Sequence, residues 1–116
     1  MVTHMIPTER VLEEYLDGQE RSPFRRWLEA LDPKARAKVT VAVSRVEQGN
    51  DSAIKSVGNG VCEIRIDWGP GYRVYFGFDG ATLIILLAGG TKQRQNRDIA
   101  EAKAMWADYK RRKKGT

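Results

Sequence analysis

The amino-acid sequence predicts an α+β layer fold with the element order β-α-α-β-β-β-α, built as one domain over residues 1–116. Two helix-start signals lie close together in the first half of the chain, and three short segments with alternating apolar residues follow them. The final segment then carries apolar residues at helical spacing. A chain of 116 residues has room for one modest core, which suits this plan.

The first predicted element is a strand at residues 11–16, VLEEYL. Its apolar residues fit strand alternation, and they also fit one face of a short helix, so both assignments stay open at this point. We prefer the strand, which ends at the break formed by Asp17 and Gly18.

Two helices follow and are expected to form a hairpin. Ser22 is a favourable N-cap, and Pro23 suits the first helical position. Asp32 and Pro33 repeat this start signal, and Gly49 is the expected left-handed residue at the end of the second helix. The apolar stripe of the first helix is Phe24, Trp27, Leu28 and Leu31, and that of the second is Ala35, Val39, Val43 and Val46.

Residues 50–60, NDSAIKSVGNG, are predicted to form a loop because they are rich in Gly, Asn, Asp and Ser. Three strands follow, at Val61–Asp67, Tyr72–Phe78 and Thr82–Ala88, and the turn residues Asp79 and Gly80 join the last two. The run LIILL is apolar on both faces, so the third of these strands is expected to be central and covered on both sides.

The predicted last helix runs from about Asp98 to Lys110, with an apolar stripe of Ile99, Ala102, Trp106 and Tyr109. The tail KRRKK, Lys110 to Lys114, carries five of the 20 basic residues, against 15 acidic residues in the whole chain. Without the tail the body is therefore formally neutral, and an anion site must depend on local clustering. We expect residues 109–116 to form a frayed, solvated, basic tail.

Two arginines, Arg65 and Arg73, lie inside neighbouring predicted strands, where the alternation of side chains decides which face they occupy. For the apolar residues of both strands to enter one core, even-numbered positions must pair with even-numbered positions. A three-residue turn preserves that parity, and the register then places Ile66 beside Val74, Asp67 opposite Arg73, and Arg65 opposite Tyr75. Both arginines share the face that points away from the helical hairpin.

Two interpretations of this arginine face compete. It is either an ordinary solvated face balanced by Glu63 and Asp67, or a binding site for phosphate. The second is favoured by cations that follow the third strand and lead into the positive N-terminus of the last helix: Lys92, Arg94 and Arg97. Tyr75 adds a surface for base stacking, and Lys55 either reaches this face or is an ordinary surface lysine.

Other kinds of site find little support in the sequence. Cys62 is the only cysteine, which excludes an internal disulfide and a cysteine-based metal site, and no carboxylate cluster suggests a metal. His4 is the only histidine, which excludes a two-histidine nuclease, and it receives no role. No apolar run approaches the roughly 18 residues of a membrane span, and the N-terminus lacks a secretory signal, so a cytoplasmic protein is expected.

Four segments resemble the RelE/ParE superfamily of bacterial toxins, and most closely its HigB-like, Gp49-like branch of addiction module killer proteins. They are SPFRRWLEALD, the stretch with VGNGV and EIRIDWGPGYRVYFG, LIILLAGGTK with the DI that follows it, and the final DYK after Trp106. The resemblance covers about Val11 to Lys110. It implies a RelE-like fold, a small antiparallel sheet with a helical hairpin on one side and a C-terminal helix.

The function that this resemblance implies is that of a type II toxin–antitoxin toxin acting as an mRNA interferase, an endoribonuclease that cuts mRNA, commonly on the ribosome. The implied partner is a helix-turn-helix antitoxin, the free toxin is expected to be a monomer, and no metal or cofactor is implied. Arg65, Arg73 and Lys92 match the catalytic basic positions of the family, and Lys55 matches a basic position in the preceding loop. Ile99 stands where some relatives carry a tyrosine.

Two alternatives to RNA cleavage remain open. One is a ParE-like toxin that binds DNA gyrase and cleaves nothing, and the other is a degenerate domain that retains only antitoxin binding. The set of Arg65, Arg73 and Lys92 favours cleavage, because a gyrase binder needs no phosphate site. In this chemistry the ribose 2′-hydroxyl attacks phosphorus, the arginines hold the phosphate, and Lys92 serves as base or acid.

Overall fold

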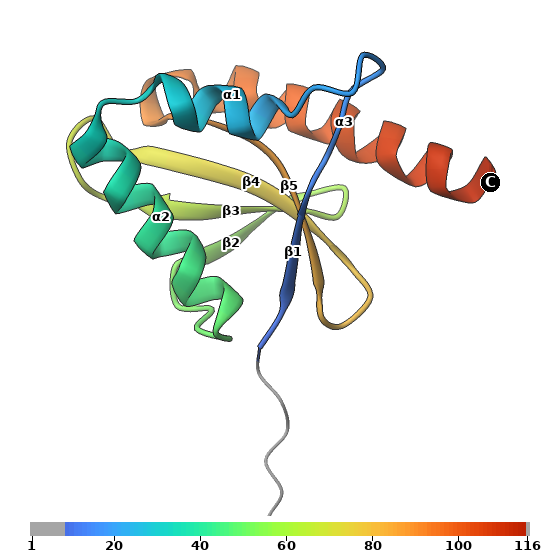
Figure 1. The fold of residues 1–116 in the computed structure, drawn as a ribbon, viewed down its shortest axis with the longest axis horizontal. Helices are drawn as coiled ribbons and strands as arrows, with labels where there is room; N and C mark the ends of the chain where they lie inside the picture. The colour runs from blue at the N-terminus through green and yellow to red at the C-terminus, as the bar shows by residue number, and fades with distance from the viewer. Residues whose placement is uncertain (1–8, 116) are drawn as a thin grey trace, which may run out of the picture.

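The computed structural model describes residues 9–115, so His4 lies outside the described part. The elements in chain order are β1 (Val11–Glu14), α1 (Pro23–Ala30), α2 (Pro33–Glu47), β2 (Ile54–Gly58), β3 (Val61–Ile66), β4 (Tyr72–Asp79), β5 (Leu83–Thr91), the 3₁₀ turn η1 (Lys92–Arg94) and α3 (Gln95–Gly115). The predicted α+β class is confirmed (Figure 1). No helix within residues 9–115 is long and apolar enough to cross a membrane.

The sheet has five strands in the order β1-β5-β4-β3-β2, and it differs from the predicted sheet in two ways. First, β1 pairs in parallel with β5, so the sheet is mixed, and the prediction of a purely antiparallel sheet was wrong. Second, residues 54–58 form an edge strand against β3, although their composition predicted a loop. An edge strand has one solvated side, so polar and glycine residues are tolerated there.

The sheet is covered on both faces, as expected for a central strand that is apolar throughout. Helices α1 and α2 pack on one face, against even-numbered residues of β3 and β4 such as Ile64 and Phe76. Helix α3 packs on the opposite face, where Trp106 and Ala102 contact the layer that contains Tyr75 and Leu87. Figure 1 shows the α1–α2 pair and α3 on either side of the strands. The arginine face is therefore the face that α3 partly covers.

The residues predicted to cap α1 and α2 lie at the ends of these helices. The Ser22 side chain accepts a hydrogen bond from the Arg25 backbone, and Asp32 does the same for Ala35. Gly49, with φ of 95°, follows the last turn of α2, and its N–H donates to the Val46 carbonyl. These side chains and backbone bonds satisfy groups that a helix end otherwise leaves unpaired.

The register of β3 and β4 confirms the predicted parity and corrects the predicted pairing. Even positions pair with even positions, but Ile64 lies opposite Val74, and Arg65 lies directly opposite Arg73 rather than Tyr75. The turn between the strands spans residues 67–71, which is two residues longer than predicted. A slip of two residues keeps every side chain on its face, so alternation alone cannot detect it.

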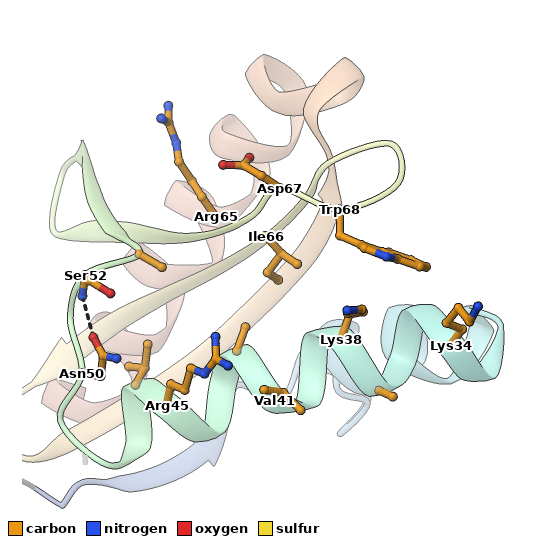
Figure 2. Close-up of a pocket in the computed structure, with 14 residues that line it drawn as sticks. Lys34, Lys38, Val41, Arg45, Asn50, Ser52, Arg65, Ile66, Asp67 and Trp68 are labelled. Carbon is orange, nitrogen blue, oxygen red and sulfur yellow. Dashed lines mark hydrogen bonds between the residues drawn. The ribbon is translucent and has the colours of Figure 1, made fainter.

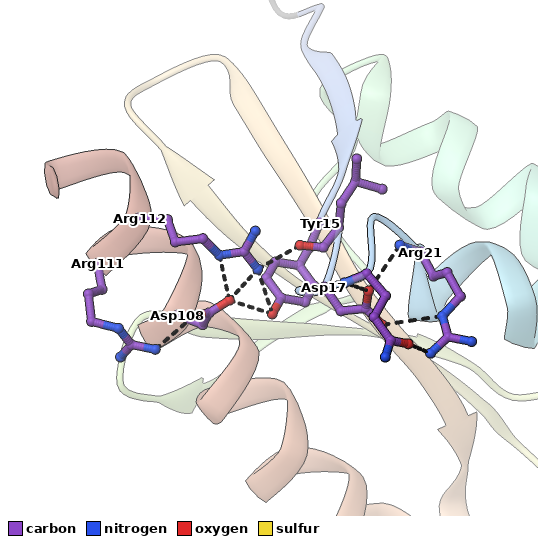
Figure 3. A network of polar contacts seen from close by, with 8 residues as sticks. Tyr15, Asp17, Arg21, Asp108, Arg111 and Arg112 are labelled. Atoms are coloured by element: carbon purple, nitrogen blue, oxygen red, sulfur yellow. Dashed lines mark hydrogen bonds and ion pairs between the residues drawn. The ribbon is translucent and has the colours of Figure 1, made fainter. Parts of the chain in front are cut away.

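The basic tail is helical and anchored, so the prediction of a frayed end was wrong. Helix α3 continues to Gly115. Tyr15 donates a hydrogen bond of 2.6 Å to Asp108, and Arg112 donates one of 2.7 Å to the Leu16 carbonyl. Arg112 also pairs with Asp108 (Figure 3). We call Tyr15, Asp108 and Arg112 the C-terminal latch, because they join α3 to the β1 edge of the sheet.

The latch predicts a stability difference that depends on pH. Hydrogen bonds from Arg112 and Tyr15 lower the pKa of Asp108 from 3.8 to about 2. A lowered carboxyl pKa contributes stability that is present above the unfolded pKa and is lost as pH falls through the folded one. We therefore expect Asp108→Asn to be less stable than wild type at pH 5 and above, and the difference to shrink between about pH 4 and about pH 2.

Urea unfolding of both proteins at several pH values measures this difference. Lys114→Gln is the matched control, because it removes a charge from the same end of α3 without touching the latch. A gap between wild type and Asp108→Asn that stays constant down to pH 2 would show that the latch carboxylate has an ordinary pKa.

Candidate functional site

The centre of the arginine face is a row of residues that crosses three strands. Arg65 on β3 lies opposite Arg73 on β4, and Arg73 lies opposite Gly90 on β5. A bulge in the pairing of β4 with β5, after Tyr75, shifts the phase of β5. Because of this shift, Gly90 rather than Gly89 lies beside Arg73 on the arginine face. Gly90 has no side chain, so the surface beside Arg73 is open to a group from another element.

Arg65 is held by a buried carboxylate. Glu63 is fully buried, and it accepts hydrogen bonds from Arg65 Nε at 2.8 Å and from Gln95 at the start of α3 at 2.7 Å. The Arg65 side chain is 41% exposed, and its two terminal nitrogens have no hydrogen-bond partner within residues 9–115. One edge of the guanidinium is thus fixed, and the other is left to bind an anion.

Arg73 is buried, which corrects the expectation that it is exposed. Only 3% of the residue is accessible. Its Nη1 donates to the Tyr72 carbonyl at 2.9 Å and lies 3.7 Å from a carboxylate oxygen of Asp67, whose side chain is 84% exposed. Its buried Nε has no hydrogen-bond partner. This cation is incompletely compensated by the protein, so it raises the positive potential at the surface above it.

Lys92 is brought close to Arg73 by the turn between β3 and β4. The Lys92 backbone donates to the Gly71 carbonyl at 2.7 Å. Gly71 has φ of 81°, and the position of its missing Cβ would be 3.3 Å from Lys92 Cβ and 3.7 Å from Arg73 Nη1. The structure therefore gathers Arg65, Arg73 and Lys92 at one end of the sheet, and it leaves the Lys92 side chain exposed.

A second buried acid, Asp98, joins α3 to this row. Its carboxylate lies against Gly90, where a Cβ would be only 1.9 Å from Oδ2. Burial raises the pKa of Asp98, and the nearby Arg94 and Arg97 act in the opposite direction. Glu63 and Asp98 are thus two buried acids on the α3 side of the sheet, and of these Glu63 pairs with Arg65. Sequence reasoning missed Asp98, although the Gly89-Gly90 pair was a signal that something approaches the strand closely.

The other predicted RNA-binding residues are more dispersed. Tyr75 is fully buried beneath α3, and burial raises its pKa, so the prediction that it stacks on a base was wrong. Lys55 is exposed on β2 opposite Glu63, one row away from the arginines. Arg94 in η1 and Arg97 in the first turn of α3 are exposed, and Arg97 pairs with Glu101.

The helix positions beside the site offer no replacement for the tyrosine of some relatives. Ile99 packs into the core layer under α3. The hydroxyl of Tyr75 is buried and lacks a hydrogen-bond partner.

Burial gives Arg73 a role in stability that an exposed arginine would not have. We expect Arg73→Ala to lower the free energy of unfolding by about 1–3 kcal/mol, because it removes a buried side chain and its hydrogen bond to Tyr72. Chemical denaturation measures this loss. Arg26→Ala, at an exposed position of α1, is the control and should change stability by no more than about 0.5 kcal/mol. Equal effects of the two substitutions would contradict the burial of Arg73.

The chemical character of the site is that of an anion receptor. Two exposed cations, Arg65 and Lys92, flank a buried third, and the exposed carboxylate of Asp67 lies beside them. Arginine and lysine donors in this arrangement suit a phosphate group. Within the described residues, no group of three or more His, Cys, Asp or Glu side chains is placed to hold a metal ion.

Two comparisons with known proteins match most of the length of this chain. Residues 26–109 match the family described as "Phage derived protein Gp49-like (DUF891)", a range that begins within α1 and includes the whole arginine face and most of α3. The chain is also 45% identical over 83 residues to an uncharacterized protein of Haemophilus influenzae strain Rd, covering 71% of this chain and 84% of that one. The chain therefore belongs to the phage-derived Gp49-like family, which is related to toxin–antitoxin systems.

Proposed function

We propose that the protein is the toxin of a type II toxin–antitoxin module, of the HigB-like branch of the RelE/ParE superfamily, and that it cleaves mRNA in the cytoplasm. Membership of the Gp49-like family supports the toxin assignment. The observation that carries the cleavage proposal is the pair of exposed cations, Arg65 and Lys92, above the buried Arg73. A phosphate bound there would accept hydrogen bonds from the free edge of the Arg65 guanidinium and from the Lys92 ammonium.

In the proposed reaction the ribose 2′-oxygen attacks the adjacent phosphorus, and the bond from phosphorus to the 5′-oxygen breaks. The Asp67 carboxylate, 3.7 Å from Arg73, takes the 2′-hydroxyl proton, and Lys92 donates a proton to the departing 5′-oxygen. Arg65 binds the phosphate oxygens, on which negative charge develops. Arg73 acts as a positioning residue, because it lies beneath the surface and holds Asp67 near the reacting group. The reaction requires no metal and no cofactor.

The proposed inhibitor is an antitoxin with a helix-turn-helix DNA-binding region. The arginine face offers it an electrostatic target, since the rest of the body has little net charge. We expect the antitoxin either to cover Arg65 and Lys92 or to displace the start of α3 beside them. A complex in which the arginine face stays open and α3 is unmoved would count against both routes.

Induced expression in bacteria tests the proposed function. Wild type and an Arg65→Ala/Lys92→Ala double variant are induced without antitoxin, the 5′ ends of cellular mRNA are mapped by primer extension, and supercoiling of a reporter plasmid is followed in the same cultures. We expect new mRNA ends within minutes for wild type, none for the double variant, and unchanged supercoiling for both.

The alternatives give different results in this experiment. Loss of supercoiling without new mRNA ends would identify a gyrase inhibitor, and it would contradict the proposal. Normal growth, intact mRNA and intact supercoiling, together with antitoxin binding, would identify a degenerate toxin.

A further inference from the structure

A groove separates α2 from the end of β3 and from the segment that precedes β2. Its volume is about 640 Å³, within the usual range for ligand sites. The lining comes from α2, from Asn50, Ser52 and Ala53 before β2, and from Arg65 to Trp68 at the end of β3. Figure 2 shows Trp68 extending from the β3 end toward the helix. Arg65 is part of the lining, but its side chain points away from α2 toward the arginine face, so the two sites meet at the end of β3 (Figure 2).

The helical wall of the groove carries unpaired positive charge. Lys34, Lys38, Val41 and Arg45 fall at i, i+4, i+7 and i+11, which places them on one side of α2 (Figure 2). All four are exposed, and within residues 9–115 none of the three cations has a carboxylate within 4.0 Å. From Lys34 to Arg45 the cations extend over about 16 Å of helix, at 1.5 Å a residue.

The opposite wall is aromatic. Trp68 is half-buried, and it stacks at 6.2 Å on Tyr72, which fixes the orientation of the indole. The Lys38 ammonium lies 5.6 Å from the centre of the Trp68 ring, a cation–π contact that a stacking base would replace. Asp67 is the acidic residue in the lining of the groove, and it points to the Arg73 side.

We propose that this groove binds the RNA strand next to the cleaved phosphate, with phosphates on Lys34, Lys38 and Arg45 and one base stacked against Trp68. Proteins that bind single-stranded nucleic acid combine a row of cations for the backbone with aromatic side chains for the bases. The groove has both, and Arg65 connects it to the proposed point of cleavage. This inference rests on the proposed function. It adds a surface that binds the RNA strand beyond the nucleotide at which cleavage occurs.

Binding of an uncleavable RNA tests the groove separately from catalysis. The probe is a fluorescent 12-nucleotide RNA with 2′-O-methyl riboses, which cannot attack phosphorus, and anisotropy is measured at several salt concentrations. The groove variant is Lys34→Gln/Lys38→Gln/Arg45→Gln. Its matched control, Arg21→Gln/Arg26→Gln/Arg36→Gln, removes the same charge from exposed positions outside the groove.

We expect the groove variant to bind weakly and to lower the slope of log affinity against log salt by about 2, since about 0.7 counterions are released for each phosphate contact on a single strand. The control should lose much less affinity and keep most of its slope. Trp68→Leu, which retains an apolar side chain in the turn, should weaken binding on the order of tenfold through lost stacking, and Trp68→Phe should restore most of it. Circular dichroism checks that each variant is folded.

Several results would overturn the inference. It fails if the groove variant and the control lose affinity equally, if Trp68→Leu binds as wild type does, or if wild type does not bind the probe. It also fails if the groove variant keeps RNA affinity but loses binding of an acidic antitoxin peptide, since the groove would then be a protein interface. The proposed function fails differently, by the absence of new mRNA ends after wild-type protein is induced.

Discussion

Arg65→Ala and Lys92→Ala are each expected to slow RNA cleavage by about 100- to 1000-fold. Arg65→Ala removes a donor to the phosphate oxygens on which charge develops, and Lys92→Ala removes the acid that protonates the departing 5′-oxygen. Lys92 is exposed and unpaired in the described residues, so Lys92→Ala should change stability by no more than about 0.5 kcal/mol. Arg65→Ala should cost about 1–3 kcal/mol, because it removes a hydrogen-bond partner of the buried Glu63 carboxylate. The measurement is the rate of cleavage of a reporter mRNA on translating ribosomes, with the toxin in excess, alongside urea unfolding of each variant.

Arg26→Ala is the control for the loss of one exposed arginine, and it should cleave at the wild-type rate. Arg65→Lys separates charge from geometry. It keeps the cation, but a lysine cannot donate to Glu63 and to phosphate as a planar fork, so a rate between wild type and alanine is expected. Cleavage by Arg65→Ala and Lys92→Ala at the wild-type rate would move the reaction away from the arginine face.

Gly90→Ala is expected to destabilise the protein by about 1–3 kcal/mol, an overpacking cost. Its Cβ would be 1.9 Å from the Asp98 carboxylate, so either that buried side chain or the start of α3 must move. The free energy of unfolding from urea titration measures the effect. Gly18→Ala is the matched control, because nothing lies within 4 Å of its missing Cβ. It should be neutral or slightly stabilising.

A second substitution tests the cause of this effect. Asp98→Ala removes the group that the new Cβ would meet, so Gly90→Ala/Asp98→Ala should be more stable than the sum of the single effects predicts. A coupling of about 0.5–3 kcal/mol is expected for residues in contact. Strict additivity would mean that Asp98 does not lie against Gly90.

Local features were predictable from the sequence. The N-caps of α1 and α2 depend on residues within one turn, so Ser22 and Asp32 predicted the starts of these helices correctly. The face shared by Arg65 and Arg73 followed from the alternation of apolar residues, which any register of correct parity must respect. The grouping of Lys92 with these arginines followed from its place directly after β5.

Features that depend on distant parts of the chain were not predictable. The burial of Tyr75 results from the docking of α3 on the sheet, and Arg73 is buried beside the turn that contains Gly71. No pattern within β4 predicts either result. The C-terminal tail is anchored through Tyr15, which lies 93 residues before Asp108, and charge patterning alone suggests a free end. The pairing of β1 with β5 is likewise a long-range contact, made with a strand of ambiguous pattern.

The central claim, that the arginine face promotes attack by a ribose 2′-hydroxyl, is tested most directly by the ends of the cleaved RNA. Products from wild type are analysed by mass spectrometry, and a substrate with one 2′-deoxyribose at the cleaved position is compared with the all-ribose RNA. We predict a 2′,3′-cyclic phosphate (or the 3′-phosphate it yields on hydrolysis), a 5′-hydroxyl, and no cleavage at the deoxyribose position. A 3′-hydroxyl with a 5′-phosphate, or undiminished cleavage at the deoxyribose position, would show that water attacks the phosphate and would contradict the proposed reaction.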